Sequence, residues 1–316
     1  MFEDLYTKVV VKESDFKINH KQNIMLIGSC FTEEIGKKLE QHGFSTMINP
    51  FGILYNPISI CECIDRIVTK NFFKPKDTIK VDEYFYLFHC HGDYRAKKRK
   101  DCLEMINLKV EQAHEFLKKT EILFITLGTS IVYKYIPQRR NLGNCHKIDS
   151  KLIERNIIDY DVHTKRLKRT LTLLKQEINP NIKIIFTISP IRHWREGYRD
   201  NMISKSNLIL TVHKLEQQLN ISYFPSYETV MDELRDYRFY ERDLLHLNET
   251  AVNHIWSKFC STYFNSDTLE LNKKFYKLWT MKNHRPLNPD TLAYEKHKEK
   301  TLSLQTELQT QTVKIL

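Results

Sequence analysis

Three short apolar runs stand at widely separated places in the chain, and each has the length of a β-strand. They cover residues 23–27, 121–127 and 182–188. Each run is nearly continuous in Ile, Leu and Phe instead of alternating with polar residues. This is typical of strands that are buried on both faces of a parallel sheet.

Helical patterns fill most of the intervals. Apolar residues recur at helical spacing in residues 32–41, 58–69, 103–118, 157–177, 201–219 and 251–263. Strands that are separated by long helices form right-handed crossovers, so the pattern predicts an α/β protein with a mostly parallel sheet.

The carboxyl ends of the strands are the expected place for chemistry. Ligands of such sheets bind in the crevice outside these ends. The residues that follow the strands, 28–31, 128–130 and 189–193, are therefore expected to share one edge of the sheet.

The composition changes after about residue 265. The remaining chain is rich in Lys, Gln and Thr and contains Pro286 and Pro289. We therefore expect a main domain in residues 1–265 and a peripheral C-terminal extension in residues 266–316, which is helical or partly disordered.

Composition favours a globular cytoplasmic protein. Of the 316 residues 28% are charged, and the mean hydropathy is −0.48. No apolar run approaches the roughly 20 residues that span a bilayer, so no membrane association is expected. The acidic start lacks the basic and then apolar layout of a secretory signal. The seven cysteines are odd in number and form no Cys-x-x-Cys pair, which favours reduced thiols.

The net charge of +10 makes anionic partners conceivable. Its densest cluster is Arg95-Ala96-Lys97-Lys98-Arg99-Lys100. Such a run is more typical of a solvated helix face or loop than of a binding groove, and no nucleic-acid-binding motif accompanies it. Nucleic-acid binding is therefore not favoured.

The turn Gly28-Ser29-Cys30-Phe31-Thr32 carries two candidate nucleophiles between a strand and a helix. The free N–H groups and positive dipole end of a helix N-terminus lower a thiol's pKa and stabilise an oxyanion. Alternatively, Ser29 caps the helix and Cys30 packs beneath it.

Asp243-Leu244-Leu245-His246 places an acid three residues before a histidine, just ahead of a predicted helix. At this spacing both side chains can turn to one side of a loop, where the carboxylate orients the imidazole as in a catalytic triad. The motif is common by chance, but a late loop that returns to the strand edge is where a base has to arrive.

Two further clusters contain histidine. His89-Cys90-His91 has no third or fourth ligand nearby, so no metal site is expected. Asn144-Cys145-His146-Lys147 brings together an amide, a thiol, an imidazole and an ammonium, in a sequence that could equally be a solvated loop.

A series of longer segments points to a known family. In chain order they are Gly28-Ser29-Cys30-Phe31, Asn49 to Pro57, Thr126-Leu127-Gly128-Thr129, Asn144 to Lys147, Ser189-Pro190-Ile191-Arg192-His193, Ser204-Lys205, Tyr223 to Glu228, Asp236 to Tyr240 and Asp243 to His246. Together, from about Ile24 to Phe264, they resemble the GSCFA family of the SGNH (GDSL-like) hydrolase superfamily.

The resemblance implies a three-layer α/β/α sandwich with a nucleophile after the first strand and an Asp-x-x-His late in the chain. Aligning Gly28 with the first glycine of the superfamily's Gly-Asp-Ser turn puts Cys30 in the place of the serine nucleophile. A shift of one residue makes Ser29 the nucleophile instead. Asp243 and His246 take the places of acid and base.

The oxyanion hole departs from the superfamily pattern. Gly52 stands where the resemblance expects a glycine donor. Where it expects Gly-x-Asn, the chain has Gly128-Thr129-Ser130. Ser130, or Asn144 from the next loop, could replace the missing asparagine.

These features lead to a functional hypothesis. We expect an ester hydrolase or acyltransferase that forms a covalent acyl-enzyme and needs no cofactor, acting on a small-molecule or carbohydrate ester such as an O-acyl or O-acetyl sugar. The candidate substrate-binding residues are His146, Lys147, Arg192 and His193. The alternative is a catalytically silent protein that binds a glycan or an anion. The sequence does not determine the oligomeric state.

Overall fold

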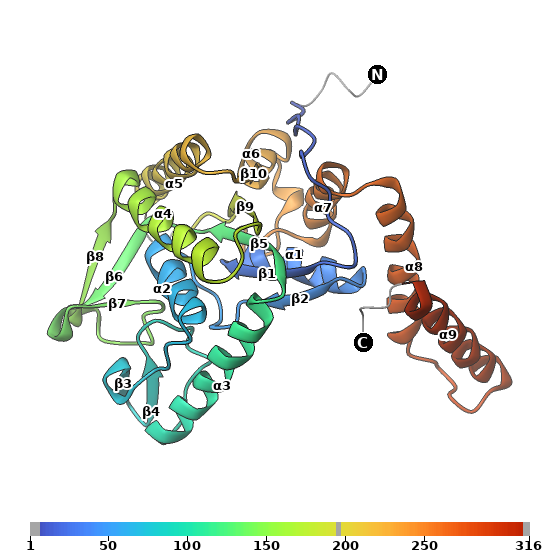
Figure 1. The fold of residues 1–316 in the computed structure, drawn as a ribbon, viewed down its shortest axis with the longest axis horizontal. Helices are drawn as coiled ribbons and strands as arrows, with labels where there is room; N and C mark the ends of the chain where they lie inside the picture. Colours follow the sequence, from blue (N-terminus) through green and yellow to red (C-terminus); the bar gives the residue numbers. More distant parts are fainter. Residues whose placement is uncertain (1–6, 194–196, 312–316) are drawn as a thin grey trace.

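The protein is built around a five-stranded parallel sheet with the strand order β10-β9-β5-β1-β2 (Figure 1). The computed structural model describes residues 7–193 and 197–311. The strands of this sheet are β1 (Asn23–Gly28), β2 (Ser45–Ile48), β5 (Thr120–Leu127), β9 (Lys183–Ile188) and β10 (Ser222–Phe224). The predicted α/β fold is confirmed.

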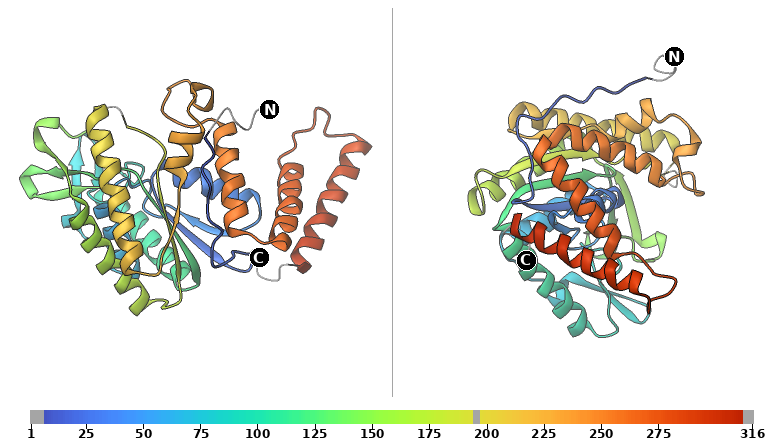
Figure 2. Two further views of the ribbon diagram at one scale, coloured as in Figure 1. Left: turned by 90° about the horizontal axis from the view of Figure 1, so that it is seen from above. Right: turned by 90° about the vertical axis from the view of Figure 1, so that its right-hand side faces the viewer.

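Helices cover both faces of the sheet. They are α1 (Cys30–Gln41), α2 (Pro57–Val68), α3 (Arg99–Leu117), α4 (Tyr160–Glu177), α5 (Tyr198–Gln218), α6 (Ser226–Glu228) and α7 (Glu249–Tyr263), followed by α8 (Ser266–Lys282) and α9 (Leu292–Gln311). Helices α2, α3, α4 and α5 share one hydrophobic core with the sheet, and α1 and α7 share another. In Figure 2 the strands lie between these two helical layers.

The near-continuous apolar runs have a direct structural cause. Along β1, Met25 and Ile27 belong to the core under α2 to α5, whereas Ile24 and Leu26 belong to the core under α1 and α7. All four side chains are at most 2% exposed. Because both faces are covered, no position in the strand can be polar without losing its solvation.

Two smaller antiparallel sheets lie outside the central one. They are formed by β3 (Thr78–Val81) with β4 (Tyr84–Leu87), and by β6 (Ile131–Tyr135) with β7 (Arg140–Leu142) and β8 (Ile153–Ile157). Short 3-10 turns occur at Pro75–Asp77, Ile136–Gln138, Ser150–Leu152 and Tyr237–Phe239, and a π turn at Thr229–Glu233. The helix predicted from residue 157 was placed too early, since Ile157 ends β8 and the helix begins at Tyr160.

The C-terminal helix α8 contacts α1, and α9 packs on the far side of α8, apart from the sheet (Figures 1 and 2). They share a small apolar cluster of Phe275, Leu278 and Leu308. Phe275 also stacks on His20, with ring centroids 4.9 Å apart. The proposed division at residue 265 remains a prediction.

Gly28 allows the turn after β1 to approach β5 closely. Its φ is +149°, and a Cβ at this position would lie 2.2 Å from the Thr126 carbonyl oxygen. Since backbone cannot move aside cheaply, Gly28→Ala is expected to lower the free energy of unfolding by about 3 kcal/mol or more. Urea unfolding measures this value. A Cβ at Gly92 would have its nearest neighbour at 3.7 Å, so Gly92→Ala serves as the control. Equal stability of the two variants would contradict the close approach.

Candidate active site

Two segments far apart in sequence meet at the carboxyl edge of the sheet. Cys30 begins α1 directly after β1, and its Sγ lies 3.9 Å from Nε2 of His246. On the other side of the imidazole, Nδ1 lies 2.6 Å from Oδ2 of Asp243. The three side chains therefore form a continuous chain from thiol to carboxylate.

Asp243 also builds the loop that carries His246. Its Oδ1 accepts the N–H groups of both Leu245 and His246 at 2.9 Å. Leu244 adopts the left-handed conformation, with a φ of 57°. The carboxylate thus fixes the backbone and the imidazole together, which explains the spacing of three residues between acid and base.

The hydrogen bonds define the tautomer of His246. Bonding to the His246 side chain and to the backbone N–H groups lowers the pKa of Asp243 to about 2. The ionised carboxylate can only accept, so Nδ1 carries the proton of this bond. In the neutral imidazole, Nε2 is then an acceptor that faces the Cys30 thiol.

Cys30 is held mainly in its protonated form. Burial raises the pKa of the thiol to about 11, although the backbone N–H groups of Phe31 and Cys30 act against this rise. At neutral pH the group facing His246 is therefore a thiol. Attack by sulfur requires that His246 remove the proton.

Ser29 occupies a different environment from Cys30. It is the residue that precedes α1, but its side chain makes no cap hydrogen bond. Its side chain is fully buried, and Oγ has no hydrogen-bond partner among the described residues. The Ser29 side chain therefore does not occupy the backbone N–H groups at the start of α1, where Cys30 lies.

The candidate oxyanion donors differ in the hydrogen bonds that they already make. The Gly52 N–H donates to the Asn49 carbonyl at 2.7 Å, and the Ser130 N–H donates to Ser204 Oγ at 2.7 Å. Asn144 accepts the His146 N–H at 3.2 Å through Oδ1. In residues 7–193 and 197–311 the Cys30 N–H has no backbone acceptor.

A pocket of about 250 Å³ lies at the same edge of the sheet. Its lining includes Tyr55, Thr129, Tyr133, Asn144 and His193. The Tyr55 carbonyl accepts the N–H groups of Gly128 at 2.7 Å and Thr129 at 3.0 Å. Burial raises the pKa of Tyr55 to about 12, and the negative charge of an ionised Cys30 adds to this rise, so the charge of Cys30 acts on this side chain of the pocket.

The four candidate substrate-binding residues are dispersed. His193 lines this pocket and meets the Tyr55 ring edge-on at 5.3 Å. Arg192 lines a separate hollow of about 300 Å³ with Arg235 and Tyr240. Lys147 is exposed. His146 is 4% exposed, with Nε2 2.9 Å from the Leu87 carbonyl oxygen.

His146 should make the fold sensitive to acid. Burial lowers its pKa from 6.5 to about 4. The unfolded chain therefore binds this proton first as pH falls, so the stabilisation from neutral His146 is full above about pH 6.5 and is lost toward pH 4. This contribution is on the order of 3 kcal/mol.

Urea unfolding at pH 7.5 and pH 4.5 tests this contribution. His146→Gln should lose less stability on acidification than the wild type. His213→Gln, which changes an exposed histidine, should behave like the wild type. Equal acid sensitivity of the His146 variant would contradict the assignment.

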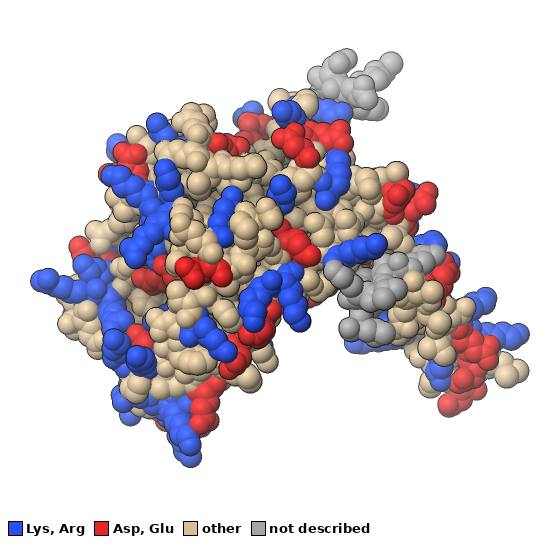
Figure 3. Space-filling view, viewed as in Figure 1, with Lys and Arg blue, Asp and Glu red and all other residues tan. Residues whose placement is uncertain are grey.

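Among the described residues, no group of three or more His, Cys, Asp or Glu side chains is placed to hold a metal ion. No helix in that part of the chain is long and apolar enough to cross a membrane. In the basic run, Lys97 pairs with Glu83 and Lys100 with Glu104. Figure 3 shows basic and acidic side chains interspersed over this face.

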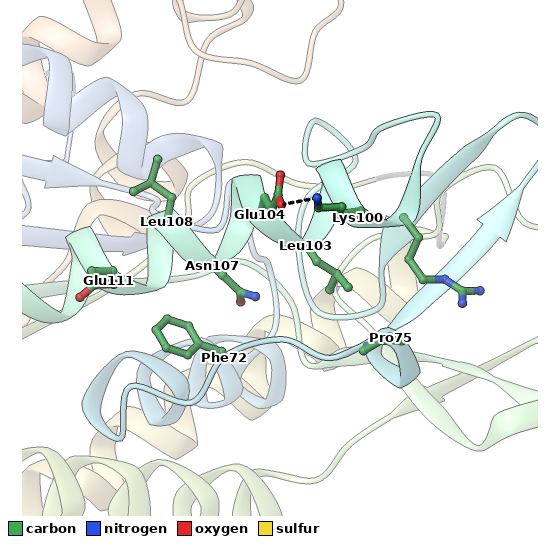
Figure 4. A pocket seen from close by; sticks show the side chains of 9 residues that line it. Phe72, Pro75, Lys100, Leu103, Glu104, Asn107, Leu108 and Glu111 are labelled. Carbon is green, nitrogen blue, oxygen red and sulfur yellow. Dashed lines mark ion pairs between the residues drawn. The ribbon is translucent and has the colours of Figure 1, made fainter.

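A wider hollow of about 700 Å³ lies between α3 and the segment before β3 (Figure 4). Its lining includes Phe72, Leu103 and Leu108, and Lys100 pairs with Glu104 along α3 at 3.6 Å. Its lining contains no Cys, Ser, Thr or His side chain, so it does not offer the nucleophile and base that the sequence predicts.

The fold and this geometry together define a class. A parallel sheet with a nucleophile turn after its first strand and an Asp–His loop before its last core helix is the arrangement of the SGNH hydrolase superfamily. The chain belongs to the GSCFA family of that superfamily, since the family's model matches residues 23–259. No curated protein matches the chain.

The sequence contained one further signal at this site. Lys205 falls in the apolar stripe of α5, in register with Leu208, Val212 and Leu215, and all four side chains are buried. A lysine at a core position of an amphipathic helix points to a specific role, because burying its charge is costly.

Proposed function

We propose that this protein is a thiol-dependent ester hydrolase or acyltransferase that works through a covalent acyl-enzyme. The observation that carries the proposal is the chain of contacts from Cys30 Sγ to His246 Nε2, at 3.9 Å, and from His246 Nδ1 to Asp243, at 2.6 Å. A nucleophile, a base and a group that orients the base are the parts that covalent acyl transfer needs.

Acylation starts from the neutral thiol. His246 Nε2 takes the proton as sulfur attacks the ester carbonyl carbon, and the carbonyl electron pair moves onto oxygen. The N–H groups of Cys30 and Phe31 at the start of α1 are suited to stabilise this oxyanion. The Asn144 amide is the favoured further donor, since the N–H groups of Gly52 and Ser130 already donate to Asn49 and Ser204. The carbonyl re-forms as the C–O bond breaks, and the leaving alkoxide receives the proton from His246.

Deacylation repeats these steps with a second oxygen nucleophile. His246 removes a proton from water or from an acceptor alcohol, which attacks the thioester carbonyl. The C–S bond breaks, and the departing sulfur regains a proton from His246. Water as nucleophile gives hydrolysis, and an alcohol gives acyl transfer.

The pocket lined by Tyr55 and His193 suits an acylated carbohydrate. Tyr55 and Tyr133 offer aromatic faces and edges, and Asn144, Thr129 and His193 offer hydrogen-bonding groups. Flat aromatic surface with a few polar groups matches the mixed character of a sugar ring. Lys147 and Arg192 are candidates to bind an anionic substituent, and His146, which precedes Lys147, ties its loop to the Leu87 carbonyl.

A catalytically silent glycan- or anion-binding protein is the second candidate. The raised pKa of Cys30, about 11, favours it because a thiol that stays protonated is a weak nucleophile. The pairing of Asp243 with His246 favours the enzyme, since binding alone does not require an oriented base.

A panel of acyl esters separates the two candidates. The protein would be incubated with aryl acetates, aryl butyrates and O-acetylated sugars, with and without a free sugar as acceptor. We expect saturable release of the acyl group, or its transfer when the acceptor is present. Saturable binding of the deacylated sugar by calorimetry, together with no turnover of any ester, would establish the binding protein instead.

A further inference from the structure

Lys205 is a buried cation that the acyl-transfer steps leave without a role. It lies in α5 and is 1% exposed. Its Nζ donates to the Gly128 carbonyl at 2.8 Å and to the Ser189 carbonyl at 2.6 Å. These carbonyls follow β5 and β9, so one side chain joins the ends of two neighbouring strands at the edge where Cys30 lies.

No carboxylate in the described part of the chain forms an ion pair with this lysine. Among the ion pairs of residues 7–193 and 197–311, none involves Lys205. A buried charge that is balanced only by carbonyl dipoles is costly, and a neutral amide could make two donor bonds of the same kind. A residue whose only role is to join the ends of these two strands would therefore not need to be a lysine.

Gly128 contacts Lys205 on one side and lies next to Ser29, the residue before Cys30, on the other. A Cβ on Gly128 would lie 3.3 Å from Ser29 Cβ, and Ser29 directly precedes Cys30. The charges of Lys205 and Cys30 act on each other, since the ammonium lowers the pKa of the thiol. The other titratable or charged groups that face Lys205 are Arg192, which follows β9, and Tyr227 in α6, whose ring centroid lies 5.5 Å from Nζ.

The neighbouring Ser204 secures the same turn without a charge. Its Oγ accepts the Ser130 N–H at 2.7 Å and lies 2.9 Å from Thr129 Oγ1. With Lys205 on Gly128, two consecutive residues of α5 hold the whole turn after β5. Ser204 and Lys205 therefore both anchor the turn after β5, and only Lys205 adds a charge there.

We propose that Lys205 is the electrostatic positioning residue of the active site: its ammonium stabilises the negative charge that develops on Cys30 sulfur while its hydrogen bonds hold the turn after β5. This inference rests on the proposed function, because it assigns Cys30 as the ionising nucleophile. It acts through Cys30 and requires no contact with substrate.

A pH dependence follows from this role. Burial lowers the pKa of Lys205 from 10.5 to about 7. The ammonium therefore stabilises the Cys30 thiolate below about pH 7, and this stabilisation is lost as the pH rises above that value. The unfolded chain keeps the proton up to about pH 10.5, so the same group makes the folded protein more stable as pH rises through that window.

Alkylation of Cys30 by iodoacetamide, followed by peptide mass spectrometry, measures how strongly Lys205 stabilises the Cys30 thiolate. The experiment does not need an ester substrate. At pH 6, Lys205→Met should react about tenfold more slowly than the wild type, and above pH 9 the two rates should converge within about twofold. Lys214→Met makes the same change at a partly exposed position of α5 and should follow the wild type throughout. A slowing that is equal at every pH would show a merely structural role and overturn the proposal.

A second measurement keeps the wild-type side chain at position 205. Iodoacetate places a carboxylate on Cys30, whereas iodoacetamide places a neutral amide of similar size. The Lys205 ammonium, followed by carbon-13 NMR of its side chain, should deprotonate at about tenfold lower proton concentration in the carboxymethylated protein. Identical titrations of the two proteins would contradict the coupling. Because neither readout involves acyl transfer, a protein that turns over no ester can still pass or fail these tests.

Discussion

Replacement of Cys30 by alanine is expected to reduce ester turnover on the order of 10⁴-fold or more, since loss of a nucleophile that acts with its base removes the covalent route. The reason is geometric. Cys30 is the side chain that meets His246 Nε2, at 3.9 Å. Turnover of an aryl acetate, measured under single-turnover conditions, gives the effect on the acylation step.

The matching replacement of Ser29 should have a small effect. Its Oγ is buried and has no hydrogen-bond partner among the described residues, so Ser29→Ala is expected to keep turnover within about threefold of the wild type. Cys260→Ala removes another partly exposed thiol and controls for general effects of losing a cysteine. A large loss for Ser29→Ala with turnover intact in Cys30→Ala would make Ser29 the nucleophile.

Asp243→Asn is expected to lower the acylation rate by roughly 10²–10⁴-fold while the protein stays folded. The amide oxygen can still accept the N–H groups of Leu245 and His246, which Oδ1 accepts at 2.9 Å. The amide nitrogen, however, is a donor and favours the His246 tautomer whose Nε2 carries the proton. That tautomer cannot accept the proton of Cys30.

The pH profile and a neighbouring variant check this assignment. The pKa of Asp243 is about 2, so the carboxylate stays ionised down to that pH and its role persists through any activity profile measured above it. Asp232→Asn changes an exposed carboxylate in the chain segment before the loop and should leave the rate unchanged. An Asp243→Asn rate equal to that of the Asp232 variant would contradict the triad.

The sheet was predicted best where its strands are long and buried on both faces. β1, β5 and β9 have continuous apolar runs that little else explains. β2 and β10 were missed because they are only four and three residues long, too short for a pattern to form. Ile157, the last residue of β8, was assigned to the helix that became α4, because an apolar residue at this position fits helical spacing as well as strand alternation.

The candidate site was also predicted only in part, because some of its features follow from the local sequence and others depend on tertiary packing. Cys30 and His246 could be placed at one edge because strand ends and a late loop must meet there. Which N–H groups are already bonded could not be known, because the partners of Gly52 and Ser130 depend on turns and on Ser204 in α5. The contrast between fully buried Ser29 and partly exposed Cys30 likewise arises only when α1 packs against the sheet.

The most direct test of the central claim is to locate the acyl group. The protein would be mixed with an activated acetyl ester, quenched in acid and digested, and the acetylated peptide sequenced by mass spectrometry. We expect an acetyl group on Cys30 that neutral hydroxylamine removes, as it does from a thioester, and no such group in Cys30→Ala. An acetyl group on Ser29 that resists this treatment, or turnover with no adduct in any peptide, would contradict the account.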